Sequence, residues 1–125
     1  MLLLPIAIFN LERAYTSTTL LLCTAMVLFV AFVLRPPWMG RFYFTFLALL
    51  IPFLLVNGLL TGMGIPGEVV RYNDEENLGI RILTIPVEDI FYGMLMQLMA
   101  VTFYETARAR WPGRAGAAPD IFAAR

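Results

Sequence analysis

Two carboxylic acids stand side by side at the start of an apolar stretch, in the sequence TIPVEDIFYG at residues 84–93. Glu88 and Asp89 follow Pro86, and proline is favoured at the first position of a helix because the N–H that it lacks would be unbonded there. Acids in a first helical turn also interact favourably with the helix dipole. For Asp89, an ordinary helix start and a chemical role therefore both stay open.

Glu88 has neighbours that suit a particular chemistry. Phe91 and Tyr92 follow it by three and four residues, so they share its face of a helix. A carboxylic acid can deliver a proton, and the faces of aromatic rings stabilise the carbocation that forms. Burial favours the protonated form of Glu88, whereas the helix dipole favours the ionised form. Ionisable residues inside membrane spans are functional candidates, so we interpret Glu88 as a functional acid.

Other polar residues in the apolar stretches allow two interpretations. Asn57 and Thr61 are four residues apart, hence on one helix face. Such side chains often make only interhelical hydrogen bonds worth about 1 kcal/mol, which is the alternative to a catalytic role. The charged loop VVRYNDEENLGIR at residues 69–81 is either a solvated turn or part of the site.

The sequence gives no support to a metal or cofactor site. It has no His and a single Cys, Cys23, so the usual imidazole and thiolate sites are missing. The charged loop lacks the twelve-position calcium pattern, and neither a P-loop nor a GxGxxG motif occurs. Glu88 and Asp89 could hold Mg²⁺, but the repeated Asp-rich clusters of prenyl-transfer enzymes are absent. We therefore expect no metal and no cofactor.

The composition indicates a membrane protein. The 125 residues are 60% hydrophobic and 14% charged, with a mean hydropathy of +0.77. Soluble domains are nearer half apolar, with about a quarter of their residues charged. All nine basic residues are Arg and the net charge is zero, so the chain has no basic patch for binding nucleic acid.

Three apolar stretches, at residues 16–34, 42–61 and 85–104, approach the ~20 residues that a membrane span needs. We predict an all-α fold, an integral membrane helical bundle with about three transmembrane helices. Residues 1–15 form a short apolar segment, residues 16–107 the domain, and residues 108–125 a flexible tail. The Arg-rich segments after the first and third stretches belong in the cytoplasm by the positive-inside rule, which places the N-terminus outside.

Several of these segments resemble the lycopene cyclase domain, a small membrane family of carotenoid cyclases. The resemblance covers about residues 11–108 and rests on PFLLVNGLLTG, VVRYNDEENLGIRILTIPVEDIFYGMLMQLM and VTFYE. The family's acidic motif is typically Pro-x-Glu-Glu followed by an aromatic pair. Pro86, Glu88 and Asp89 occupy the acidic part here. Tyr92 and Gly93 stand at the pair, with Phe91 one position early. Many members carry Asp where this chain has Asn57.

The resemblance implies an intramolecular lyase or isomerase that closes β-ionone rings on a linear carotenoid such as lycopene, without net redox change. Glu88 or Asp89 would protonate the terminal double bond, and a carboxylate would later remove a ring proton. The residues implied to bind substrate or stabilise the cation are Phe91, Tyr92, Asn57 and Tyr72. The family usually works as two homologous three-helix halves, so we predict a second half or a homodimer in the lipid bilayer of the bacterial cytoplasmic membrane.

Two other functions stay open on the sequence alone. The chain could be a non-catalytic scaffold that binds carotenoid and supports an active partner. It could also be a fragment of a transporter or channel in which Glu88 is an ion site, because intramembrane carboxylates serve that purpose too.

Overall fold

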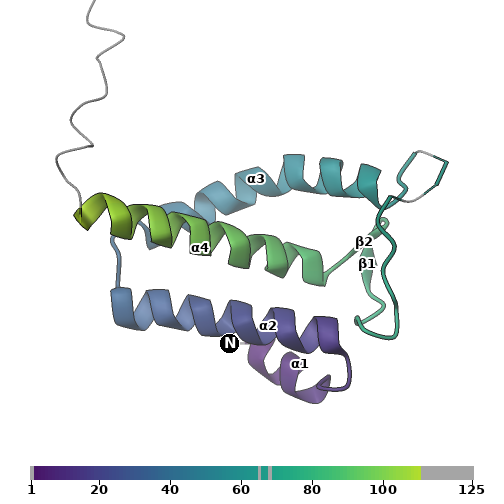
Figure 1. Cartoon of the computed structure of the whole chain (residues 1–125), viewed down its shortest axis with the longest axis horizontal. Helices are drawn as coiled ribbons and strands as arrows, with labels where there is room; N and C mark the ends of the chain where they lie inside the picture. Colours follow the sequence, from purple (N-terminus) through teal and green to yellow (C-terminus); the bar gives the residue numbers. More distant parts are fainter. Residues whose placement is uncertain (1, 65, 68, 111–125) are drawn as a thin grey trace, which may run out of the picture.

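The computed structural model describes residues 2–64, 66–67 and 69–110, and most of these residues are helical. Figure 1 shows long helices lying side by side, with a small hairpin at one end. The elements in chain order are α1 (Leu3–Phe9), α2 (Ala14–Leu28), the π-helical turn η1 (Phe29–Leu34), α3 (Met39–Leu60), β1 (Arg81–Ile82), β2 (Ile85–Pro86) and α4 (Glu88–Arg110). The predicted helical fold is confirmed, apart from two short antiparallel strands that we did not expect.

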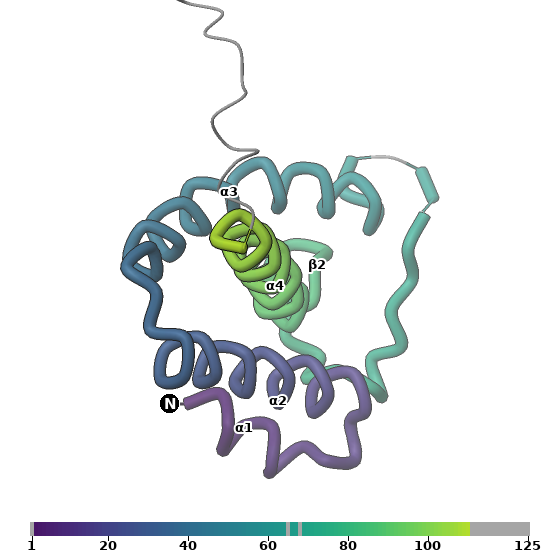
Figure 2. The backbone as a smooth tube through the Cα atoms, turned by 60° about the vertical axis from the view of Figure 1, so that its left-hand side comes forward, coloured from purple at the N-terminus to yellow at the C-terminus, as the bar shows by residue number. Residues whose placement is uncertain are grey.

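Two proline positions shape the long helices. The helix formed by α2 and η1 ends at Arg35, which adopts the left-handed conformation with φ 47°, and the following Pro36 disfavours further helix. Pro52 lies inside α3, where it removes one backbone N–H from the hydrogen-bond ladder. Figure 2 shows α3 curving along its length, as expected of a helix with an internal proline.

Two of the three predicted spans have matching helices. Ala14–Leu34 and Met39–Leu60 are long and apolar enough to cross a membrane, judged by length and composition. They correspond to the predicted stretches 16–34 and 42–61. The third long helix, α4, has 23 residues. It is not among the candidate membrane spans of the described residues, because its sequence is more polar. A third span therefore stays a prediction.

The bundle packs around α4. This helix lies along α2. The short helix α1 packs against α2, and α3 contacts α4 at fewer points than α2 does. A small core of Val30, Phe42, Phe46 and Leu98 joins the long helices. Most large side chains of α3 face outward, and Phe44 is 78% exposed. Exposed apolar surface on this scale is typical of a face that meets lipid or another protein.

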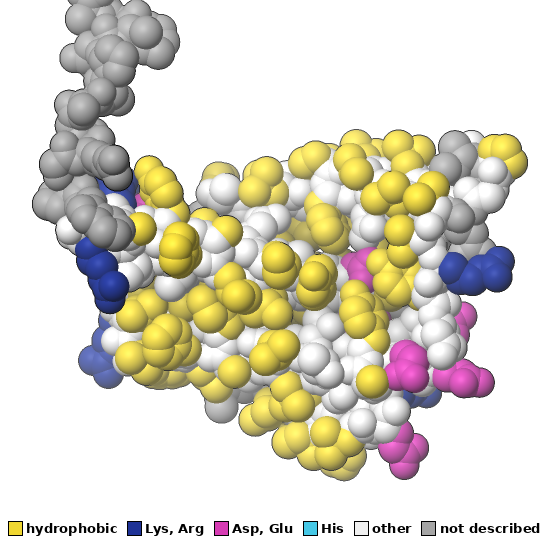
Figure 3. All heavy atoms as spheres, in the orientation of Figure 1, with side chains coloured by type: hydrophobic (Ala, Val, Ile, Leu, Met, Phe, Trp, Pro, Cys, Tyr) yellow, Lys and Arg dark blue, Asp and Glu magenta, His cyan; other side chains and the backbone are white. Residues whose placement is uncertain are grey.

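Charged side chains gather at the two ends of the bundle. Figure 3 shows basic side chains where α2 leads into α3 and where α4 ends, and both acidic and basic ones at the hairpin end. Hydrophobic side chains cover much of the face between them. The last helix continues through Arg110, so residues 108–110 of the predicted tail are helical, and residues 111–125 lie outside the described residues.

Candidate active site

The two adjacent acids are both buried at the hairpin end of the bundle. Glu88 is fully buried and Asp89 is 3% exposed, and they form the first two residues of α4. The helix begins two residues after Pro86, which belongs to β2 and not to the first helical position. The acids therefore lie in the first helical turn, as predicted, whereas Pro86 does not occupy the first helical position.

Asp89 accepts three hydrogen bonds from three separate segments. The Tyr15 hydroxyl of α2 donates to Oδ1, and Oδ2 accepts from Asn57 Nδ2 of α3 at 2.7 Å and from the Tyr72 hydroxyl at 2.6 Å. Tyr15 and Tyr72 also lie ring to ring, with centroids 5.9 Å apart. All three of these partners are hydrogen-bond donors, so both oxygens of Asp89 act as acceptors.

Glu88 has a different environment although it is the next residue. Its Oε1 accepts from the Thr16 hydroxyl at 2.6 Å and from the backbone N–H of Leu78 at 2.7 Å. Its Oε2 is buried and has no hydrogen-bond partner among the described residues. A buried polar atom without a partner is costly. The two carboxyls therefore differ: one is fully satisfied and the other has a free oxygen.

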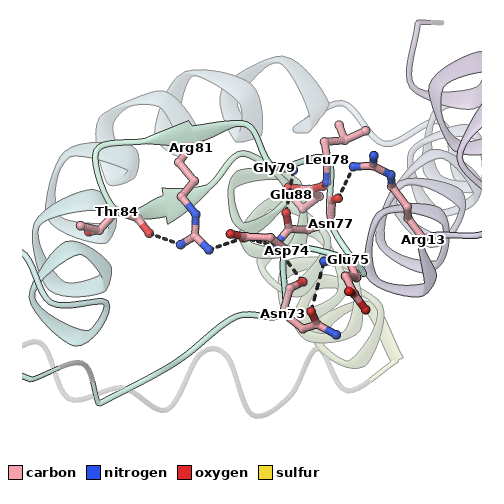
Figure 4. Close-up of polar contacts among 10 residues, drawn as sticks. All are labelled: Arg13, Asn73, Asp74, Glu75, Asn77, Leu78, Gly79, Arg81, Thr84 and Glu88. Atoms are coloured by element: carbon pink, nitrogen blue, oxygen red, sulfur yellow. Dashed lines mark hydrogen bonds and ion pairs between the residues drawn. The ribbon is translucent and has the colours of Figure 1, made fainter.

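The charged loop is anchored to the site, so it is more than a solvated turn. The backbone carbonyl of Glu76 accepts from the N–H groups of Tyr15 and Thr16 at the start of α2, where a helix has unbonded donors. The Arg13 side chain donates to the backbone carbonyl of Asn77 (Figure 4). Since Leu78 follows directly and bonds Glu88, these contacts fix the loop over the buried acid.

Polar contacts also hold the loop to the hairpin. Asp74 pairs with Arg81, whose side chain also donates to the Thr84 carbonyl at 2.9 Å (Figure 4). The hydrogen bond from Arg81 lowers the pKa of Asp74 below its usual range. Asn77 is 1% exposed, and its Oδ1 accepts from the N–H of Gly79, a residue with φ +70°. Glycine suits this left-handed position because it has no Cβ.

The structure brings together some of the predicted site residues. Asn57 and Tyr72 both donate to Asp89. Phe91 is half-buried and Tyr92 is exposed, and neither contributes to this hydrogen-bond network within the described part of the chain. Tyr92 instead lines a hollow of about 480 Å³ between α2 and α4. The Thr61 hydroxyl lies 2.9 Å from the Asn57 carbonyl of its own helix and 2.6 Å from the hydroxyl of Thr84 in the hairpin, so among the described residues it makes no hydrogen bond to another helix.

The position of Gly93 is filled by a ring from another helix. A Cβ built on Gly93 would lie 3.2 Å from the Phe53 ring of α3, so a larger side chain there would force the ring to move. Gly93 is four residues after Asp89 and shares its helix face. The Phe53 ring of α3 therefore lies one helical turn after Asp89, against Gly93, the position of the acidic motif that has no side chain in this sequence.

Sequence reasoning missed Tyr15, Thr16 and the Leu78 N–H. Each bonds one of the two carboxyls. Tyr15 and Thr16 are more than seventy residues from α4, at the start of the first predicted span. The available signal was the polar run at that boundary, Tyr-Thr-Ser-Thr-Thr, which is unusual at the start of an apolar helix.

Replacing Tyr72 by Phe is expected to lower the stability of the folded chain by about 1–2 kcal/mol, because it removes one donor from a charged acceptor. Burial, with the hydrogen bond to Asp89, raises the pKa of the Tyr72 phenol above its ordinary 10.0. Tyr72 therefore contributes stability below pH 10 that falls as the pH rises further. Thermal unfolding in detergent at pH 8 and above pH 10 measures this, and the difference between the two proteins should shrink at high pH.

Tyr104→Phe is the matched control, because Tyr104 is 62% exposed near the other end of α4. It should leave the unfolding temperature unchanged at both pH values. An equal loss in both variants would contradict the assignment of the effect to Asp89.

Among the described residues, no three His, Cys, Asp or Glu side chains are grouped as a metal site.

Comparison with known proteins identifies the family. No curated protein and no solved structure matches the sequence. A family model described as lycopene cyclase matches residues 12–107, which is most of the chain and includes the two acids with their donors Tyr15, Thr16, Asn57 and Tyr72. The chain belongs to the lycopene cyclase family.

Proposed function

We propose that this chain is one half of a membrane-embedded cyclase that closes β-ionone rings on a linear carotenoid such as lycopene. Family membership supports a role in carotenoid cyclisation. The observation that carries the acid–base assignment is the contrast between two neighbouring carboxyls. Asp89 accepts three hydrogen bonds, whereas Glu88 has a buried Oε2 without a partner among the described residues.

Glu88 is the acid in this proposal. Its Oε1 already accepts two hydrogen bonds, as the carbonyl oxygen of a protonated carboxyl would. A proton on Oε2 neutralises the group, which avoids a buried charge with an unpartnered oxygen. Asp89 is the carboxylate, because Tyr15, Asn57 and Tyr72 all donate to it. One neutral acid and one anion at adjacent positions provide the pair that the reaction needs.

The reaction then proceeds without any oxidant or cofactor. Glu88 transfers its proton to the terminal double bond of the polyene, and a carbocation forms. The neighbouring double bond attacks this cation and closes the six-membered ring. The ring then loses a proton to a carboxylate of the pair, so no proton is gained or lost overall. The negative charge of Asp89 stabilises the cation in a site of low dielectric, and Phe91, Tyr92 and Tyr72 are the candidate ring donors.

A second half is part of the proposal. Three long helices enclose little volume, and the outward side of α3 is apolar, with Ile51 67% exposed and Leu47 63% exposed. A homologous half or a second copy of this chain would cover part of that surface. We place the assembly in the bilayer of the bacterial cytoplasmic membrane, with α4 as the third span, because the substrate is a hydrocarbon that dissolves there.

Co-expression tests this function. The chain is produced in a lycopene-accumulating host with and without the product of its genomic neighbour, and the pigments are separated by chromatography. We expect cyclic carotene only when both halves are present, or from this chain alone if its partner is a second copy. Cyclic carotene from the neighbour alone would contradict a catalytic role and support the alternative of a carotenoid-binding scaffold. Linear pigment only, with both halves inserted in the membrane, would contradict the cyclase function altogether.

A further inference from the structure

A long groove runs between α3 and α4. It consists of two hollows of about 320 and 410 Å³ that share Leu49 and Gln97 as lining residues. We call this the α3–α4 groove, and its main lining residues are Trp38, just before α3, and Phe46, Leu49, Phe53, Val56 and Asn57 on α3. Its lining is mostly apolar, with Arg41 and Glu105 at the end far from the acids.

One end of the groove reaches the candidate active site. Asn57 lines the groove and donates to Asp89 Oδ2 at 2.7 Å. Phe53 also lines it and lies over Gly93, one helical turn after Asp89. Figure 3 shows a small acidic patch recessed among hydrophobic side chains between α3 and α4. On its α3 side the groove therefore ends at a residue that is bonded to Asp89, while its lining residue on α4 at this end is Gln97, eight residues further along that helix.

The dimensions of the groove suit a linear molecule. From Arg41 to Asn57 it follows α3 for about 24 Å at the usual rise per residue, which is most of the ~30 Å hydrocarbon core of a bilayer. The two helices meet at few points, where Phe42 and Phe46 pack with Leu98 in the core and Phe53 lies against Gly93. A compact ligand would fill one hollow only, whereas a long apolar chain fills both and buries its surface along the whole groove.

We propose that the α3–α4 groove holds the polyene chain of the carotenoid, with the reacting end beside Phe53 and Asn57. The inference rests on the proposed function and adds where the substrate lies. The hollow between α2 and α4 is the other place to consider, because Tyr15 and Tyr92 line it. It is a single hollow near the start of both helices, and the carboxylate of Glu76 lies in its wall. The α3–α4 groove is longer and has its charges only at the far end.

Gln97 is the polar residue in the middle of the groove. It lines both hollows, and no hydrogen bond of its side chain occurs within the described residues. If a helix of the partner half filled the groove, Gln97 would be expected to bond to it across the interface. A hydrocarbon chain needs no such bond. The variant Gln97→Leu therefore distinguishes a carotenoid chain in the groove from a helix of the partner half. We expect the amount of bound lycopene to stay unchanged or to increase. Dissociation of the partner half from this variant would contradict our proposal.

The main test measures binding and not turnover. The full chain carries Glu88→Gln so that linear carotene is retained, and it is co-produced with its partner half in a lycopene-accumulating host. Lycopene bound per purified complex is then quantified by absorbance. Leu49→Trp blocks the junction of the two hollows and should reduce bound lycopene roughly tenfold. Met99→Trp places the same ring on α4 two residues from Gln97, on a 48% exposed side chain that does not line the groove, and should have no effect.

Two further variants make the result decisive. Val56→Phe adds less volume and should reduce binding in the same direction, even if Leu49→Trp disturbs folding. Leu22→Trp fills the α2–α4 hollow and should not reduce binding. Retention of lycopene by Leu49→Trp and Val56→Phe, loss with Leu22→Trp, or release of the partner half by Leu49→Trp would each overturn the proposal. Because binding is the readout, a failure of the cyclase function would appear separately, as linear pigment only from the unsubstituted chain produced with its partner half.

Discussion

Replacing Glu88 by Gln is expected to abolish ring closure while the helices stay folded and inserted. Gln keeps an oxygen that can accept from Thr16 and from the Leu78 N–H, which lie 2.6 and 2.7 Å from Glu88 Oε1. It replaces the unpartnered Oε2 by an amide nitrogen, which cannot protonate an alkene. General acid catalysis contributes about 10²–10⁴-fold, so cyclic carotene should fall by at least this order. Pigment chromatography of the membranes, normalised to the amount of protein, measures it.

The control is Glu75→Gln in the charged loop. Glu75 is exposed and lies at the same end of the bundle, so this variant removes one negative charge nearby without touching the two buried acids. It should keep the wild-type pigment profile. Cyclic carotene at the wild-type level in the Glu88→Gln membranes would remove Glu88 as the acid. That outcome would favour the scaffold interpretation, or Asp89 as the proton donor.

The long helices could be predicted because their signal is local. An uncharged apolar run of about 20 residues must satisfy its own backbone in a bilayer, and a helix does so within the segment. Residues 16–34 and 42–61 are such runs, and both are helical up to residues 34 and 60. The third stretch was harder to bound, because its start has two acids. The structure begins α4 at Glu88 and assigns Ile85 and Pro86 to a hairpin that depends on pairing with residues 81–82.

The candidate site was predictable only where polarity stood out. Asn57 in an apolar helix and Glu88 before one are conspicuous in the sequence, and the structure places both at the site. Tyr15 and Thr16 were missed because their partners are more than seventy residues away. Which residues meet across a bundle depends on how helices pack, and local periodicity does not encode it. The role of Glu76 at the start of α2 is hidden for the same reason.

The second large effect is expected from Asp89→Asn, and it should differ in kind from that of Glu88→Gln. Asn has one acceptor oxygen and one donor nitrogen, so it cannot accept from Tyr15, Asn57 and Tyr72 together. The nitrogen would face at least one donor, and the remaining bonds would lose their charge. Hydrogen bonds to charged groups are worth about 1.5–3 kcal/mol each, so we expect a loss of roughly 2–4 kcal/mol in stability together with the loss of activity.

A double-mutant cycle shows whether the loss comes from the hydrogen bonds themselves. If Asp89 acts through its donors, Tyr72→Phe should cost little in a chain that already carries Asp89→Asn, giving a coupling of about 1 kcal/mol or more. Tyr104→Phe is far from the site and should show no coupling with Asp89→Asn. Thermal unfolding of the four proteins in detergent supplies the cycle. Strictly additive effects of Asp89→Asn and Tyr72→Phe would mean that Asp89 does not hold α2, α3 and the loop together, and its role would then be confined to the chemistry.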